Sequence, residues 1–192
     1  MKTTSLFRIG GIAILLSAIL VGIFDLFHFL SREPSPSTFV LWIGIIIDTL
    51  RVLGLGALFA WQAQRGGILG LIGYVLLVCG SLAGIGFWAV QLGVSAGVIS
   101  EAQLAQVSSY AFGSTILLWS LYLGEVAFGI SILRAQVFPK YTGTLLILVG
   151  VLHYLTGSLA FTLPIYGILS VVVYAWLGWI LTSTKVAGMK AT

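Results

Sequence analysis

The sequence predicts an all-α membrane protein, a polytopic helix bundle that crosses the bilayer six times as a single membrane domain, residues 1–192. The chain is 59% hydrophobic and only 7% charged, whereas an average soluble domain carries about 25% charged residues. Its apolar residues also recur in runs of about 20, each long enough to cross a hydrocarbon core of about 30 Å. We therefore expect the chain in a cell membrane (plasma or inner), with the lipid bilayer as its principal partner.

Six apolar segments are expected to form transmembrane helices, at about residues 7–31, 38–62, 67–93, 111–133, 141–162 and 164–183. The first segment follows Lys2 and Arg8 but lacks a small-residue cleavage site, which favours a membrane helix over a signal peptide. The first connection, residues 31–38, is polar and contains prolines, so it should lie outside the lipid. The second connection is a tight turn at residues 64–67.

Only the third connection, residues 94–110, is long. Within it, Ser100 followed by Gln103 resembles a capping box, in which each residue satisfies a backbone N–H of the other. We therefore expect a short interfacial helix at about residues 100–108. The remaining connections are short and contain Pro139 and Pro164.

The distribution of basic residues predicts the orientation. Seven of the nine fall in the N-terminus, the even-numbered connections and the C-terminus, and these are Lys2, Arg8, Arg65, Arg134, Lys140, Lys185 and Lys190. Arg32 lies in an odd-numbered connection and Arg51 within a segment. Since short cytoplasmic loops are enriched in Lys and Arg, both termini are expected in the cytoplasm. Scattered basic residues of this kind also give no indication of nucleic-acid binding.

An internal repeat is a further possibility. When Asp48 is aligned with Glu125, Gly80-Ser-Leu-Ala83 falls on Gly157-Ser-Leu-Ala160 without a gap. This alignment predicts that helices two and three correspond to helices four and five in a parallel duplication, as in some transporters. The alternative is chance similarity, because glycine and leucine are abundant in membrane helices.

Among the ionisable residues inside the predicted segments, six acidic, basic or histidine side chains stand out away from the ends, and these are Asp25, His28, Asp48, Arg51, Glu125 and His153. A charge at the centre of a membrane helix costs about 2.5–3.5 kcal/mol on insertion scales, so such residues normally face protein or water. The six are therefore our candidates for a substrate- or ion-binding site.

Spacing along the helices adds detail to this hypothesis. Asp48 and Arg51 are three residues apart on one helix face and are expected to form an ion pair. Asp25 and His28 have the same spacing. In the functional interpretation, the six groups lie at successive depths in the membrane and form a polar path along which protons or a small solute can move. Read structurally, Asp48 and Arg51 neutralise each other and Glu125 completes a packing network.

The aromatic residues divide into two groups. Trp119 and Tyr122 precede Glu125 on the fourth segment and are expected to line an internal cavity, where a cation can be held by the carboxylate and the aromatic faces. The other group falls near predicted helix ends, as an interfacial belt requires, and contains Trp42, Trp61, Trp88 and Trp179.

No catalytic residue, metal site or cofactor is predicted. Bis-histidine haem ligation is disfavoured because His28 and His153 are expected at depths that differ by about 8 Å. A zinc site needs three close ligands. A serine hydrolase needs a Gly-x-Ser-x-Gly turn, and neither Gly80-Ser81 nor Gly113-Ser114 has these flanking residues.

The leading functional hypothesis is a small integral membrane protein with an intramembrane polar site that binds or transports a small solute or protons. One alternative is a non-catalytic structural subunit of a larger membrane complex, since short loops and close-packing glycines suit such a role or a homo-oligomer. A membrane enzyme that acts on a lipid or quinone is the third hypothesis, disfavoured by the lack of a paired nucleophile and base.

Overall fold

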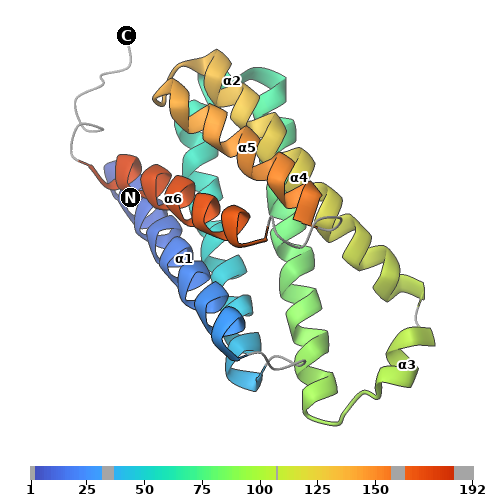
Figure 1. Ribbon diagram of the computed structural model, residues 1–192. Coiled ribbons are helices and arrows are strands. Elements are labelled where there is room, and N and C mark those ends of the chain that lie inside the picture. Colours follow the sequence, from blue (N-terminus) through green and yellow to red (C-terminus); the bar gives the residue numbers. More distant parts are fainter. Residues whose placement is uncertain (1–2, 32–36, 107, 157–162, 184–192) are drawn as a thin grey trace.

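The computed structural model describes residues 3–31, 37–106, 108–156 and 163–183, and this part of the chain is helical apart from short connections (Figure 1). Its helices are α1 (Thr3–Ser31), α2 (Thr38–Ser95), α3 (Glu101–Gln106), α4 (Ser108–Ala135), α5 (Lys140–Thr156) and α6 (Leu163–Thr182). The predicted all-α class is confirmed. The end of the predicted segment 141–162, residues 157–162, lies outside the described residues.

Helix α3 is the short helix expected before the fourth segment. The Gln103 N–H donates to Ser100 Oγ at 3.2 Å, and the Ser100 N–H donates to Gln103 Oε1 at 2.9 Å. These reciprocal bonds form the capping box that the sequence indicates, and they explain why the helix begins at Glu101.

Four helical stretches in the described residues are long and apolar enough to cross a membrane, and these are Ser5–Phe27, Thr38–Ser95, Thr115–Ala135 and Ile165–Thr182. A shorter apolar stretch, Lys140–Leu155, lies in α5. Length and composition therefore mark the chain as a multi-pass membrane protein. Two of the six predicted segments lie within α2. The four long apolar stretches therefore do not by themselves give the number of crossings, and six crossings stay a prediction.

Helix α2 is a helical hairpin rather than one straight rod. A straight helix of its 58 residues would be about 87 Å long. Gly67, with φ 57° and ψ −160°, has a backbone conformation that is essentially restricted to glycine, and the chain reverses there (Figure 1). The arms, residues 38–66 and 68–95, then pack together: Phe59 stacks on Tyr74 with ring centroids 4.6 Å apart.

Glycines bring α4 close to both of its neighbours. A Cβ added at Gly73 would lie 2.5 Å from the backbone nitrogen of Phe128, so the second arm of α2 touches the α4 backbone. A Cβ at Gly143 would lie 2.7 Å from the Gly129 carbonyl oxygen, which brings α5 against α4. Small residues allow this close approach. Helix α4 therefore lies between the second arm of α2 and α5, with Gly73 packed on one side of it and Gly143 on the other.

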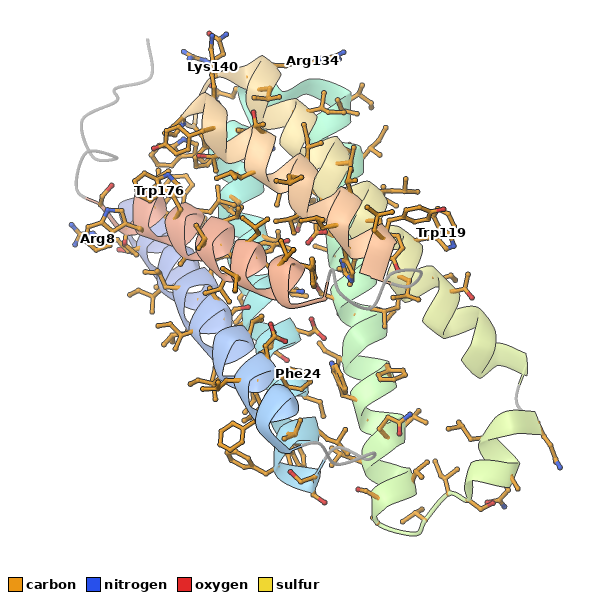
Figure 2. The ribbon with its side chains drawn as sticks, in the orientation of Figure 1. Arg8, Phe24, Trp119, Arg134, Lys140 and Trp176 are labelled. Carbon is orange, nitrogen blue, oxygen red and sulfur yellow. The ribbon has the colours of Figure 1, made fainter. Side chains whose placement is uncertain are left out.

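The helix ends are also tied together. Ser131 Oγ of α4 donates to the Gly66 carbonyl at 3.1 Å, beside the reversal of α2. Arg134 and Lys140 lie at this same end of the bundle (Figure 2). A Cβ at Gly11 would lie 2.8 Å from the Gly178 carbonyl oxygen, so the start of α1 packs on the end of α6.

Candidate functional site

Asp48 is held from both arms of α2. Its Oδ1 lies 3.6 Å from Arg51 Nη1, the ion pair that the spacing predicts, and its Oδ2 accepts a hydrogen bond from Trp88 Nε1 at 3.0 Å. Asp48 and Arg51 are both buried. Because a buried charge is tolerated only when it is paired and hydrogen-bonded, these contacts account for two of the intramembrane charges.

Two glycines shape this contact between the arms. A Cβ at Gly84 would overlap with the Asp48 carboxylate, and a Cβ at Gly44 would lie 2.7 Å from the Trp88 indole. Gly44 and Asp48 share a face of the first arm because they are four residues apart, and Gly84 and Trp88 share one on the second. Each arm therefore contributes one large polar side chain, Asp48 or Trp88. Each arm also contributes a glycine, Gly44 or Gly84, that leaves room for the large side chain of the other arm.

Glu125 of α4 is the most deeply buried acid described, with 1% of its surface exposed. Tyr174 of α6 donates its hydroxyl to Glu125 Oε1 at 3.1 Å, and His153 Nδ1 of α5 lies 3.4 Å from Oε2. Gly150, one turn before His153, would place a Cβ 3.0 Å from Glu125 Cβ. The missing side chain at Gly150 thus lets α5 carry His153 to the carboxylate.

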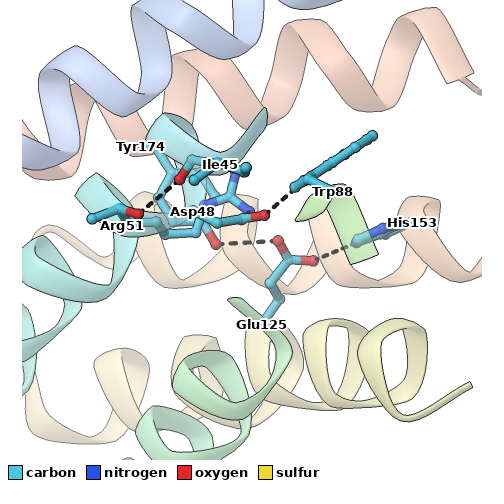
Figure 3. Close-up of polar contacts among 8 residues, drawn as sticks. Ile45, Asp48, Arg51, Trp88, Glu125, His153 and Tyr174 are labelled. Carbon is cyan, nitrogen blue, oxygen red and sulfur yellow. Dashed lines mark hydrogen bonds and ion pairs between the residues drawn. The ribbon is translucent and has the colours of Figure 1, made fainter. Parts of the chain in front are cut away.

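Tyr174 links the two parts of the site. The guanidinium carbon of Arg51 lies 5.0 Å from the centroid of the Tyr174 ring, within the cation–π range of about 6 Å, while the Tyr174 hydroxyl bonds Glu125. Figure 3 shows this continuous arrangement, with Asp48 and Arg51 on one side of Glu125 and His153 on the other. We refer to Asp48, Arg51, Trp88, Glu125, His153 and Tyr174 as the buried network.

Two further tyrosines face the His153 imidazole. Tyr166 of α6 stacks on it with ring centroids 4.3 Å apart and planes inclined by 29°. Tyr122 of α4 meets it edge-on at 4.6 Å and 72°. Tyr122 is itself buried, and its expected place in the lining of an internal cavity stays a prediction.

The expectation that Trp119 lines an internal cavity is wrong. Its side chain is 48% exposed and projects from the side of the bundle (Figure 2), where its ring packs 5.7 Å from that of Tyr154 and 6.0 Å from that of Tyr122. Trp119 precedes Glu125 by six residues, so at 3.6 residues per turn the two side chains point about 120° apart.

Two of the candidates, Asp25 and His28, belong to α1. Asp25 is half-buried, and its carboxylate fits against Gly167 of α6, where a Cβ would overlap with it. His28 belongs to α1, but its side chain lies outside the described residues. The pairing of Asp25 with His28 therefore stays a prediction.

Sequence reasoning missed three side chains of the site. Trp88 resembled a belt residue because it lies near a predicted helix end, yet it donates to Asp48. Tyr166 and Tyr174 were not singled out, although they are eight residues apart in the sequence and so lie on one helix face. That shared tyrosine face is the signal that could have identified them.

The described residues contain no group of three or more His, Cys, Asp or Glu side chains that could hold a metal ion. No family model matches the chain, and neither a curated protein nor a solved structure matches it significantly. The fold and the site therefore define a class, a helical multi-pass membrane protein with a buried polar network, and its function has to be argued from that network.

Proposed function

We propose that this chain is a small polytopic membrane protein whose buried network binds or moves a small solute or protons. One observation carries the proposal: Asp48, Arg51, Glu125 and His153, from three helices, meet in contacts linked by Tyr174. Ionisable residues at this depth are costly and usually mark ion pathways or binding sites. Tyr122 and Tyr166 line the same site, and Asp25 and His28 form its outer approach.

Stability alone is a weak explanation for such a network. Replacing a buried ion pair by well-packed apolar residues is often neutral or stabilising. A chain that needed only packing could fill these positions with leucine, as it does at Leu55, Leu58 and Leu77, which are completely buried in the same core. Retention of four ionisable groups therefore favours a task that uses their charge.

In the proposed topology the chain crosses the membrane six times. The two arms of α2 are taken as separate crossings, which with α1, α4, α5 and α6 makes six, with both termini in the cytoplasm. The position of Arg134 and Lys140 at the end where α2 reverses, near Arg65, supports this orientation. The parallel duplication of helices two and three as four and five stays a prediction.

Proton flux into proteoliposomes tests the function. The purified chain is reconstituted with a pH-sensitive dye inside the vesicles, and a potassium diffusion potential drives proton entry. We expect wild-type flux to fall about 10- to 100-fold in Asp48→Asn and Glu125→Gln, since hydrogen bonds to charged groups contribute about 1.5–3 kcal/mol. Glu101→Gln, on α3 outside the network, is the matched control and should keep wild-type flux.

The opposite outcome would identify a structural role. If Asp48→Asn and Glu125→Gln retain full proton flux and lose only thermal stability, the network holds the bundle together and the proposal fails. Native mass spectrometry would then show whether the chain purifies with stoichiometric partners, as a subunit of a membrane complex should.

A further inference from the structure

The buried network holds two basic side chains in the same way. Arg51 lies beside the Asp48 carboxylate and over the ring of Tyr174. His153 lies beside the Glu125 carboxylate and stacks on the ring of Tyr166, with Tyr122 against its edge. A carboxylate combined with aromatic faces is the environment in which proteins hold cations. The network thus contains two seats for a cation, built by different residues.

The two seats differ in how permanently they are filled. Arg51 stays protonated at all accessible pH values, so it balances Asp48 continuously. His153 is the basic side chain that contacts Glu125 among the described residues, and a histidine carries a positive charge only while both of its ring nitrogens are protonated. The second seat is therefore neutral overall only while the Glu125–His153 pair carries one proton.

Among the described residues, the other titratable groups that face this pair do not remove that requirement. Helix α4 contributes Tyr122 and α6 contributes Tyr166 and Tyr174, which are neutral phenols near pH 7. Helix α2 contributes the Asp48–Arg51 ion pair. Helix α1 contributes Asp25, which packs on Gly167 beside Tyr166 and can only add negative charge.

We propose that Glu125, Tyr122 and Tyr166 form a binding seat for a small organic cation of the quaternary ammonium type, filled in this structure by the His153 ring, and that the cation displaces this ring and the proton of the Glu125–His153 pair. This inference rests on the proposed function and specifies its solute. When the cation enters, the pair's proton leaves for water. The charge of the seat is unchanged, so each cation bound releases one proton.

The chemistry of the seat selects this class of solute. An anion would meet the Glu125 carboxylate, and a neutral solute would leave that carboxylate uncompensated in a buried site. A hard metal ion such as Mg²⁺ or Ca²⁺ needs about six oxygen ligands, whereas this seat offers aromatic rings and one carboxylate. A weakly hydrated organic cation is attracted by both.

Aromatic side chains also connect the seat to the surface of the bundle. Tyr122, at the seat, lies 5.9 Å from Tyr154, whose ring lies 5.7 Å from that of Trp119. Tyr154 and Trp119 are both exposed on the α4–α5 face. The exposed position of Trp119, unexpected from the sequence, therefore provides a route along which a cation remains on aromatic faces.

Proton release on binding tests the inference directly. The full chain in detergent, weakly buffered near pH 7, is mixed with choline, and a pH dye reports released protons. We expect up to about one proton per chain at saturation. The neutral isostere 3,3-dimethylbutan-1-ol should release none, and Glu125→Gln should release none with either compound. Tyr166→Leu should weaken choline binding about tenfold, while Tyr166→Phe, which keeps the ring, should stay within about threefold of wild type.

Three results would overturn the cation seat: no proton release with choline, equal release with the neutral isostere, or wild-type affinity in Tyr166→Leu. An acid–base titration without choline separates this failure from failure of the proposed function. If wild type takes up a proton near neutral pH that Glu125→Gln does not, the network binds protons and only the cation seat is wrong. If the titrations coincide, the network binds no proton near neutral pH, and the proton form of the proposed function fails together with the cation seat.

Discussion

At the scale of single residues, the missing side chains of glycine determine where the buried charges lie. Gly84 leaves room for the Asp48 carboxylate, Gly167 for that of Asp25, and Gly44 for the Trp88 indole. An acid on a membrane helix gains stability only where another helix offers it a polar partner in a matching gap. The glycines are thus part of the site as well as of the packing.

Substitution of Gly84 by alanine tests this fit. The added Cβ overlaps with the Asp48 carboxylate, so the side chain must move and its bond from Trp88 is strained. We expect Gly84→Ala to lower the free energy of unfolding by about 1–3 kcal/mol and to shift the emission of Trp88, measured by thermal and denaturant unfolding in detergent.

Gly86→Ala is the matched control on the same arm, because nothing lies within 4 Å of its Cβ. It should leave stability unchanged or raise it by up to about 1 kcal/mol, since alanine favours helix over glycine. Equal effects of the two substitutions would show that Gly84 does not make room for Asp48.

The residue scale also shows how far sequence reasoning reaches. The Asp48–Arg51 ion pair follows from a spacing of three residues in one helix, and the structure has it. The bond from Trp88 to Asp48 joins residues forty positions apart, and its existence depends on how the arms of α2 align. No local sequence pattern shows how the two arms align. For that reason Trp88 resembled a residue of the interfacial aromatic belt.

At the scale of the element, Gly67 decides that α2 is a hairpin. The glycine-rich turn at residues 64–67 was predictable because glycine breaks helices and supports unusual backbone angles. The structure places the whole change in direction at Gly67, with helix assigned on both sides. The mutual contacts of the arms, such as Phe59 on Tyr74, then fix the angle of the hairpin, and these contacts are long-range.

Gly67→Ala should weaken the hairpin even though its Cβ would meet nothing within 4 Å. The reason is conformational, since φ 57° with ψ −160° is strained by about 1–3 kcal/mol for a residue with a side chain. We expect a loss of unfolding free energy of this size, measured by denaturant titration in detergent. Gly56→Ala on the first arm, where the nearest atom is 4.0 Å away, serves as the control and should not be destabilised; equal stability of both variants would contradict the strain argument.

At the scale of the whole molecule, the apolar composition predicts a helical protein in a lipid bilayer. The distribution of Lys and Arg predicts which side of the membrane the termini face. The number of crossings depends on a different quantity, the direction of the second arm of α2. The second arm follows the first directly after the non-helical Gly67, and four long apolar stretches are found among the described residues. The reversal at Gly67 and the contacts between arms support a separate crossing by each arm.

Cysteine accessibility tests whether the second arm crosses. In a Cys79→Ser background, single cysteines replace Gln64, exposed before the reversal, or Val98, exposed just beyond the other end of the arm. With the reversal in the cytoplasm, a membrane-impermeant maleimide added to intact cells should label Val98→Cys and should label Gln64→Cys only after the cells are permeabilised. Labelling of both positions from the same side would mean that residues 68–95 return without crossing. Glu125 would then lie in a bundle of four or five crossings, and the cytoplasmic placement of the C-terminus would have to be argued again from the charges of α4–α6.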